Sequence, residues 1–343
     1  MRKDFVRNVL VIFLVAMLAL SFYLVSSAPA EQKVVGVSNL WLGNEWNSRC
    51  HETIVNYLEN KGHKVISTNA QGRTSQQKAD IENFVSMKVD GIVIKGGEGD
   101  AFLDISKKAW DANIPIVDVI MMLPHAIHHS VDDSWQGTTN LAIWMVNQMH
   151  GSGKYIALHA AGWHTLEVRK RMLEEVFSWF PEIKRIGDYH EVDPADPVNR
   201  SYAITKATLR AHPDLKGVVA TWGLPAVGAI RAIKELKKEK QVCVISIDQE
   251  AALLALMQKP DCPPTAVVGI EPNLQGLATA QAMDAALKYN TVQEAKDNIP
   301  AVSLTPVAYV ATTGIDEFKP KVIYKSIDEA WEGNFGKDAK KPW

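Results

Sequence analysis

Residues 89–120 read VDGIVIKGGEGDAFLDISKKAWDANIPIVDVI, and this stretch decides the fold. It predicts a short apolar strand over residues 91–95, a helix over residues 101–112 and a second strand over residues 116–120. Short strands that alternate with helices of roughly 10–15 residues are typical of βαβ units, in which the strands run parallel. We therefore interpret the stretch as one unit of a parallel α/β sheet.

The same alternation continues on both sides of this stretch. Before it, strands are expected at residues 33–38 and 64–68, and helices at residues 47–61 and 75–87. After it, the expected strands cover residues 155–159, 185–189, 218–221, 242–247, 266–270 and 304–310, and the expected helices cover residues 136–149, 165–179, 198–211, 226–239, 250–258 and 274–289. Two Rossmann-like α/β lobes fit this order, with a boundary at residues 130–135. Ligands of open parallel sheets bind beyond the carboxyl ends of the strands, so two such sheets predict a cleft between the lobes.

The amino terminus has the layout of a secretory signal. Arg2, Lys3 and Arg7 precede an uncharged apolar run over residues 9–25, and residues 28–30 form an A-x-A pattern. We expect cleavage after Ala30 and export of the mature chain. An uncleaved anchor is the alternative, because the run is long for a signal core and short for a membrane span.

The charge balance argues against several classes of partner. The chain of 343 residues has 37 Lys and Arg against 39 Asp and Glu. Without a basic excess, the composition gives no indication of nucleic acid as a partner. One count is unusual, because 10 Trp stand beside 9 Phe and 8 Tyr. Indole rings suit a core, an interface or a stacking surface, and their positions must decide among these.

The three cysteines leave one pairing open. Their number is odd, so at least one of them is unpaired within the chain. Cys50 falls in an expected helix, whereas Cys243 and Cys262 flank successive elements and could form a disulfide in an oxidising compartment. Three buried thiols are the alternative. No C-x-x-C motif indicates zinc or thioredoxin chemistry.

No motif makes an enzyme the leading hypothesis. The GGEGD run at residues 96–100 follows a strand, as a phosphate-binding loop would, but Glu98 and Asp100 would repel a phosphate, and we expect a tight turn there. Asp132 and Asp133 suit a hinge or a helix cap better than an acid/base pair.

Histidines provide no clear metal site either. His125, His128 and His129 share one expected loop, but no motif marks a third ligand beside the adjacent pair. We therefore expect no catalytic residue, no cofactor and no metal.

The ends of the expected strands carry aromatic and charged residues instead. Sugar rings present C–H faces that pack on aromatics, and hydroxyl groups that pair with carboxylate, ammonium and guanidinium groups. Closure of a cleft on a polyol would satisfy such buried charges. These strand-end residues are Ser38, Trp41, Asn44, Trp46, Lys95, Trp163, Arg169, Trp222, Asp248 and Glu271.

At this level the chain resembles the periplasmic sugar-binding proteins of ABC importers, of the ribose/galactose-binding type. The segments that carry the resemblance are KVVGVSNLWLGNEWN, VDGIVIKGGEGDAF, AWDANIPIVDV, AHPDLKGVVATWGLPAVGAIRAI and VISID, within roughly residues 33–310. The resemblance implies two lobes joined by a hinge of three chain crossings, near residues 132–133, 270–271 and 303. It gives residues 31–132 plus 271–303 to the first lobe, and residues 133–270 plus 304–343 to the second lobe and tail.

The resemblance also implies roles for individual residues. Ser38 and the region from Asn44 to Trp46 match the first ligand loop, and Lys95 matches a polar contact of the third strand. Arg169 matches the arginine of the second lobe, Asp248 matches an aspartate that binds hydroxyl groups, and Glu271 lies near a further polar contact.

Two departures from the family pattern bear on the ligand. Where an Asp-Arg pair usually ends the fourth strand, this chain has Ile120 and Met121, with Asp118 two residues earlier. Trp222 stands where the family often has Asn. A smaller polyol, a modified sugar or a partly apolar ligand fits these changes better than an ordinary ribose or aldopyranose.

We therefore expect an exported solute-binding protein that delivers a sugar or polyol to an ABC permease in the inner membrane. The second hypothesis is a periplasmic sensor that presents a sugar-like signal to a chemoreceptor or sensor kinase. A hydrolase that uses the Asp132–Asp133 pair or the histidine loop is the third. The signal segment and the lack of a basic amino-terminal helix-turn-helix exclude a repressor of the LacI type.

Overall fold

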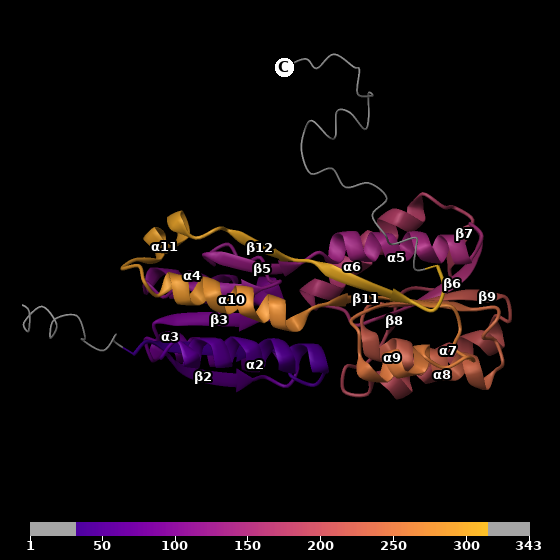
Figure 1. The fold of residues 1–343 in the computed structure, drawn as a ribbon, viewed down its shortest axis with the longest axis horizontal. Coiled ribbons are helices and arrows are strands. Elements are labelled where there is room, and N and C mark those ends of the chain that lie inside the picture. Colours follow the sequence, from indigo (N-terminus) through magenta and orange to yellow (C-terminus); the bar gives the residue numbers. More distant parts are fainter. Residues whose placement is uncertain (1–31, 315–343) are drawn as a thin grey trace, which may run out of the picture.

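The computed structural model describes residues 32–314. The expected signal segment with its cleavage site and the chain beyond residue 314 lie outside the described residues. Figure 1 shows two lobes arranged end to end along the long axis, each built on its own sheet. None of the helices in residues 32–314 has the length and apolarity that a membrane crossing needs.

The first lobe is a six-stranded sheet in the order β12-β5-β4-β3-β1-β2, and every neighbouring pair is parallel. Helices α2 and α10 pack together on one face, and α3 and α4 pack against the other. The elements of this lobe are β1 (Val34–Asn39), α2 (Glu45–Asn60), β2 (Lys64–Asn69), α3 (Thr74–Ser86), β3 (Gly91–Lys95), η1 (Gly99–Phe102), α4 (Leu103–Asp111), β4 (Ile116–Val119), β5 (His128–Asp132), α10 (Pro272–Ala286), α11 (Val292–Asn298) and β12 (Val302–Thr305).

The second lobe is a sheet in the order β13-β11-β10-β9-β6-β7, with β8 beside β6. Helices α5 and α6 cover one face, and α7, α8 and α9 cover the other. Its elements are α5 (Ser134–Gln148), β6 (Gly153–His159), α6 (His164–Ser178), β7 (Ile183–Arg185), β8 (His190–Glu191), α7 (Pro197–Ala211), β9 (Leu215–Ala220), α8 (Gly223–Glu235), β10 (Cys243–Ile247), α9 (Ala251–Met257), β11 (Thr265–Ile270) and β13 (Val307–Ala311).

The chain changes sheet at three places. It passes from β5 to α5 at Asp133, from β11 to α10 at Glu271, and from β12 to β13 at Pro306. In Figure 1 these segments run side by side between the two lobes. The carboxyl ends of the strands of both sheets therefore lie near the crossings, as the parallel arrangement requires.

The predicted α/β class with two parallel sheets is confirmed, but the last predicted strand is wrong in detail. Residues 304–310 are divided at Pro306 between β12 in the first sheet and β13 in the second. Proline has no N–H group for a ladder hydrogen bond, which favours a strand end at this position. The strand β13 pairs with β11 antiparallel, so the second sheet is mixed at its edge.

The strand predicted over residues 185–189 is also wrong. The structure has two short strands there, β7 and β8, and both pair with β6. Gly187 lies between them with a φ of 67°, a left-handed conformation that interrupts an extended chain.

Two elements of the structure, β5 and α11, are not predicted by the sequence pattern. The strand β5 includes His128 and His129, which were assigned to a loop, because its sequence HHSVD has no apolar run. The helix α11 follows Thr291, whose side chain accepts a hydrogen bond from the N–H of Glu294. That T-x-x-E spacing is the signature of a capping box and could have revealed the helix.

Cys243 and Cys262, which the sequence allows to form a disulfide, are not bonded to each other. All three cysteines are free, and Cys243 and Cys50 are buried. Burial raises the pKa of Cys50 to about 11, which keeps its thiol protonated and unreactive.

The GGEGD run forms the tight turn expected after β3. Gly96 and Gly97 have φ values of 67° and 129°, which are costly for other residues. A Cβ added at Gly97 would lie 2.6 Å from Cε2 of Phe102 and 2.7 Å from Oε1 of Gln77. Gln77 is buried and donates to the carbonyl of Gly96 over 3.0 Å, so it is held in place.

Replacing Gly97 with alanine therefore combines backbone strain with overpacking. We expect Gly97→Ala to lower the free energy of unfolding by about 2–4 kcal/mol, measured by urea denaturation. Gly62→Ala is the matched control, because Gly62 has a φ of 88° but nothing within 4 Å of the added carbon. The control should lose only about 1 kcal/mol. Equal losses in the two variants would contradict the packing argument.

Candidate functional site

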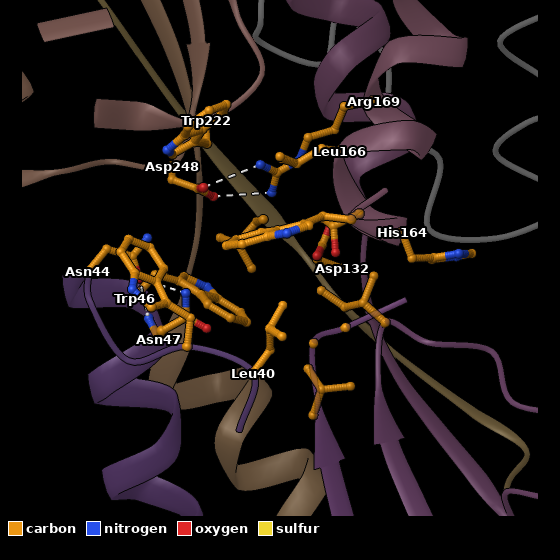
Figure 2. A pocket seen from close by; sticks show the side chains of 18 residues that line it. Leu40, Asn44, Trp46, Asn47, Asp132, His164, Leu166, Arg169, Trp222 and Asp248 are labelled. Carbon is orange, nitrogen blue, oxygen red and sulfur yellow. Dashed lines mark hydrogen bonds and ion pairs between the residues drawn. The ribbon is translucent and has the colours of Figure 1, made fainter. Parts of the chain in front are cut away.

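A cavity of about 80 Å³ lies between the two lobes, where the strands of both sheets end. Figure 2 shows its lining side chains, which come from both lobes and converge on one space. The lining residues are Leu40, Trp41, Asn44, Trp46, Asn47, Gly96, Gly97, Val119, Ile120, Asp132, Trp163, His164, Thr165, Leu166, Arg169, Trp222, Asp248 and Ile270.

Most of the predicted site residues line this cavity. The structure brings together the four tryptophans assigned to strand-end loops with an asparagine, an arginine and an aspartate: Trp41, Asn44, Trp46, Trp163, Arg169, Trp222 and Asp248. Each lies after the end of a strand rather than within it. The mixture of indole rings and charged groups gives the cavity both apolar faces and strong hydrogen-bonding groups.

An ion pair between Arg169 and Asp248 forms one wall. Two guanidinium nitrogens of Arg169 lie 3.2 Å from the two carboxylate oxygens of Asp248, a bidentate arrangement. Arg169 also donates to the carbonyl of Thr221 over 2.8 Å, and its side chain is 3% exposed. This geometry fixes the guanidinium plane and compensates both buried charges.

Trp222 reaches the same wall from the start of α8. It is largely buried among the residues that pack between α8 and the sheet. Gly223 follows it because the chain comes close to its neighbours there: an added Cβ would lie 2.7 Å from the carbonyl oxygen of Asp248. Trp222 therefore packs in the core of the second lobe and also lines the cavity.

The first turn of α2 forms the opposite wall. The side-chain oxygen of Asn44 caps the helix by accepting from the N–H of Asn47 over 2.9 Å. Asn47 also donates from its own amide to the same oxygen over 2.8 Å. Trp46 lies between them in the sequence, and its Nε1 has no hydrogen-bond partner among residues 32–314.

Lys95 lies behind this wall and does not line the cavity. Its side chain is buried, its Nζ donates to Oδ1 of Asn47, and Nζ lies 5.3 Å from the centroid of the Trp46 ring. Burial lowers the pKa of Lys95 to about 8. Lys95, which the sequence predicts as a ligand contact, instead supports Asn47 and Trp46 from behind the wall.

Three further predicted residues lie outside the cavity lining. Ser38 is buried within β1, and Glu271 caps α10 by accepting from the N–H of Asn273. The carboxylate of Asp118 accepts hydrogen bonds at 2.9–3.2 Å from three backbone N–H groups of the loop after β4, and one from Nδ1 of His129 at 2.8 Å. These bonds use both oxygens of Asp118, so it holds the loop rather than facing the cavity.

Several lining residues were missed as ligand contacts. Asn47 is one helical turn after Asn44, and this spacing was available in the sequence. His164 begins α6 and faces the first lobe, since its N–H lies 3.5 Å from the carbonyl oxygen of Gly97. Asp132 is the last residue of β5. Because the sequence does not predict this strand, it does not predict that Asp132 lies at the carboxyl edge of the sheet.

Two histidines of the predicted loop have hydrogen-bond partners, and the ring of the third, His125, lies 6.3 Å from that of Trp110. The ring of His128 lies within hydrogen-bond distance of the carbonyl of Pro300 and the hydroxyl of Ser303, and His129 pairs with Asp118. The part of the chain that the structure describes holds no group of three or more His, Cys, Asp or Glu side chains arranged to bind a metal ion.

Contacts between the lobes close the cavity on two sides. On one side the amide of Asn44 donates to Glu250 over 3.1 Å, and the N–H of Ala251 donates to Glu45 over 3.2 Å. On the other side Trp41 and Trp163 meet edge to face, with ring centroids 6.0 Å apart. Both of these tryptophans also line a groove on the outer surface, so the pair separates the cavity from the exterior.

Comparison with known proteins identifies the family. A model described as periplasmic binding protein domain matches residues 35–291, and the chain belongs to this family of binding proteins. The predicted resemblance is thereby confirmed. The ribose import binding protein of Bacillus subtilis is 22% identical over 282 residues, which cover 78% of this chain and 86% of that protein.

Two solved structures share the fold. An ABC transporter solute binding protein from Agrobacterium vitis with bound allitol has a TM-score of 0.77 and 21% identity, over 84% of this chain and 98% of that one. The 5-methylthioribose transporter solute binding protein from Thermotoga lettingae, in complex with 5-methylthioribose, has a TM-score of 0.71 and 21% identity, over 83% of this chain and 89% of that one.

The burial of Glu250 gives the free energy of unfolding a pH dependence with a definite sign. Burial raises the pKa of Glu250 to about 7, and the charges of Asp248 and Glu45 act in the same direction. Because this value lies above the ordinary pKa of a glutamate, the folded state holds a proton that the unfolded state has released. The corresponding stability is complete below about pH 4.5 and is lost as the pH rises through about 7.

Between about pH 5 and 8 we expect the free energy of unfolding of the wild type to fall by about 1–3 kcal/mol more than that of Glu250→Gln. Urea denaturation at several pH values measures the two slopes. Glu182→Gln, at a side chain that is 73% exposed, should keep the wild-type slope. Parallel curves for the wild type and Glu250→Gln would refute the assignment.

Proposed function

We propose that this member of the periplasmic binding protein family captures a small sugar or polyol between its lobes and delivers it to an ABC import permease. The observation that carries the proposal is the cavity itself, where four tryptophans from both lobes surround a bidentate Arg169–Asp248 pair. Apolar C–H faces of a sugar match indole rings, and hydroxyl groups match the charged pair. The names of the ribose-binding relative and of the allitol-bound neighbour point to the same ligand class.

The predicted contact residues keep distinct roles in this proposal. Trp41, Trp46, Trp163 and Trp222 contribute ring faces or edges, while Asn44, Arg169 and Asp248 contribute hydrogen bonds. Lys95 acts as a positioning residue through Asn47 and Trp46. Ser38, Asp118 and Glu271 support the strands, loops and helix start around the cavity.

Ligand capture requires the lobes to separate and close. We propose the hinge at the three chain crossings, with residues 32–132 plus 272–305 moving against residues 134–270 plus 307–314. The third crossing lies at Pro306 rather than near residue 303, because residues 304 and 305 still pair with β5 of the first sheet. Each crossing is a short segment between two elements, which suits hinge bending. The contacts Asn44–Glu250 and Trp41–Trp163 would break on opening and re-form on closure.

The place of action follows from the same proposal. A binding protein that serves a permease works outside the cytoplasmic membrane, and the sequence of residues 1–30 fits a signal that is cleaved after Ala30. The mature protein would then act in the periplasm.

The departures at the end of β4 point to a ligand with some apolar character. Val119 and Ile120 line the cavity there, together with Leu40 and Leu166. Aliphatic side chains cannot pair with hydroxyl groups, so this part of the cavity favours a deoxy, alkylated or thioether-bearing position of the ligand.

Calorimetric titration with D-ribose, allitol, myo-inositol and 5-methylthioribose tests the ligand class. If none of the four compounds gives a heat of binding, the proposal for this class is refuted.

Intrinsic fluorescence tests the location of the site. Trp163 lines the cavity and contacts Trp41, so ligand binding should change its emission. We expect Trp163→Phe to lose part of the ligand-induced change, since three other tryptophans line the cavity, and to bind about 3–10 times more weakly. Trp179→Phe is the control, because Trp179 lies 59% exposed at the far end of α6. An unaltered emission change together with wild-type affinity in Trp163→Phe would place the ligand elsewhere.

A further inference from the structure

The side chain of Asp132 is a buried carboxylate with one free oxygen. It is the last residue of β5, at the crossing between the lobes, and it is 2% exposed. Its Oδ1 accepts a hydrogen bond from the hydroxyl of Ser134, whereas Oδ2 has no hydrogen-bond partner among the described residues. Asp132 lines the cavity, and Figure 2 shows it among the side chains that converge there.

Within residues 32–314, no side chain donates a hydrogen bond to this oxygen. Arg169 is the cation whose charge acts on Asp132, but two of its nitrogens are bound to Asp248 and one of these also serves Thr221. The remaining nitrogen of Arg169, Nε, has no partner within residues 32–314 either. A buried acceptor and a buried donor are therefore both unused at the same cavity.

Such groups are costly in an isolated protein. Buried polar atoms of native proteins nearly always have a hydrogen-bond partner, and a buried carboxylate needs one more than most. Burial raises the pKa of Asp132, and the charge of Asp248 acts in the same direction, while Arg169 and the hydroxyl of Ser134 oppose the rise. A donor supplied from the cavity would satisfy Oδ2 and stabilise its charge.

We propose that Oδ2 of Asp132 accepts a hydrogen bond from a ligand hydroxyl group, and that Asp132 thereby selects neutral polyhydroxylated ligands. This inference rests on the proposed function. At the end of the parallel neighbour β4 the cavity is lined by the aliphatic Val119 and Ile120, so Asp132 provides the polar group at this edge of the first sheet. A carboxylated ligand would be repelled at this point by Asp132 and Asp248.

The position of Asp132 also gives the contact a mechanical consequence. The carboxylate belongs to the first sheet, and Ser134, which holds it, begins the first helix of the second lobe. A ligand hydroxyl bound there ties the ligand to the crossing itself, next to the contacts that Arg169 and Asp248 make from the second lobe. Asp132 is thus placed to couple ligand binding to closure.

The experiment compares Asp132→Asn with Asp133→Asn. Asp133 is the adjacent residue, which caps α5 by accepting from the N–H of Gln136, a role that asparagine also fills. Affinities for D-ribose, allitol, myo-inositol and 5-methylthioribose are measured by calorimetry on the mature full-length chain, and melting temperatures are measured without ligand.

For each of these four compounds that the wild type binds, we expect Asp132→Asn to bind about 10–100 times more weakly, the loss typical of a hydrogen bond to a charged group. Its melting temperature without ligand should equal or exceed that of the wild type, because a buried charge is removed. Asp133→Asn should match the wild type in both measurements.

Two results would overturn the inference about Asp132 and leave the proposed function intact. Affinity of Asp132→Asn within about threefold of wild type would show that no ligand hydroxyl uses the carboxylate. A melting temperature several degrees below wild type without ligand would show that the carboxylate is structural. If the wild type binds none of the four compounds, the proposed function fails, and the inference fails with it.

Discussion

The bidentate ion pair between Arg169 and Asp248 is the interaction on which the rest of the site depends. Two opposite charges are buried beside the cavity, and each would be expensive to desolvate alone. The pair, with the bond from Arg169 to the carbonyl of Thr221, ties the first turns of α6 to the ends of β9 and β10. This arrangement holds one wall of the cavity through interactions within the protein, so that under the proposed function little ordering would be left for ligand binding to supply.

The opposite wall is built on a different principle. A single buried cation, Lys95, lies under Asn47 and the ring of Trp46, and burial shifts its pKa toward neutrality. Asn44 caps α2 and at the same time reaches Glu250 across the cavity entrance. One wall is therefore held by a compensated ion pair and the other by a helix cap with a supporting lysine. The contact between Asn44 and Glu250 joins the two walls.

Much of this arrangement was predictable because βαβ periodicity fixes where strands end. Trp41, Trp163 and Trp222 lie just after paired strands, and the sequence placed them at the cavity correctly. Ser38 and Asp118 are penultimate residues within strands, so their side chains point to sheet faces rather than off the edge. The sequence favours a hinge or cap at Asp132 because Asp133 and Ser134 suit a helix start, and it does not predict β5, which lacks an apolar run. The free oxygen of Asp132 is a tertiary feature that no local pattern reveals.

Hydrogen–deuterium exchange with and without allitol or D-ribose tests the central claim most directly, because it reports on both walls in one experiment. The account predicts that the compound that binds slows exchange of backbone N–H groups simultaneously at residues 40–47 of the first lobe and at residues 163–169 of the second. Protection confined to one lobe, or located away from both segments, would contradict binding between the lobes.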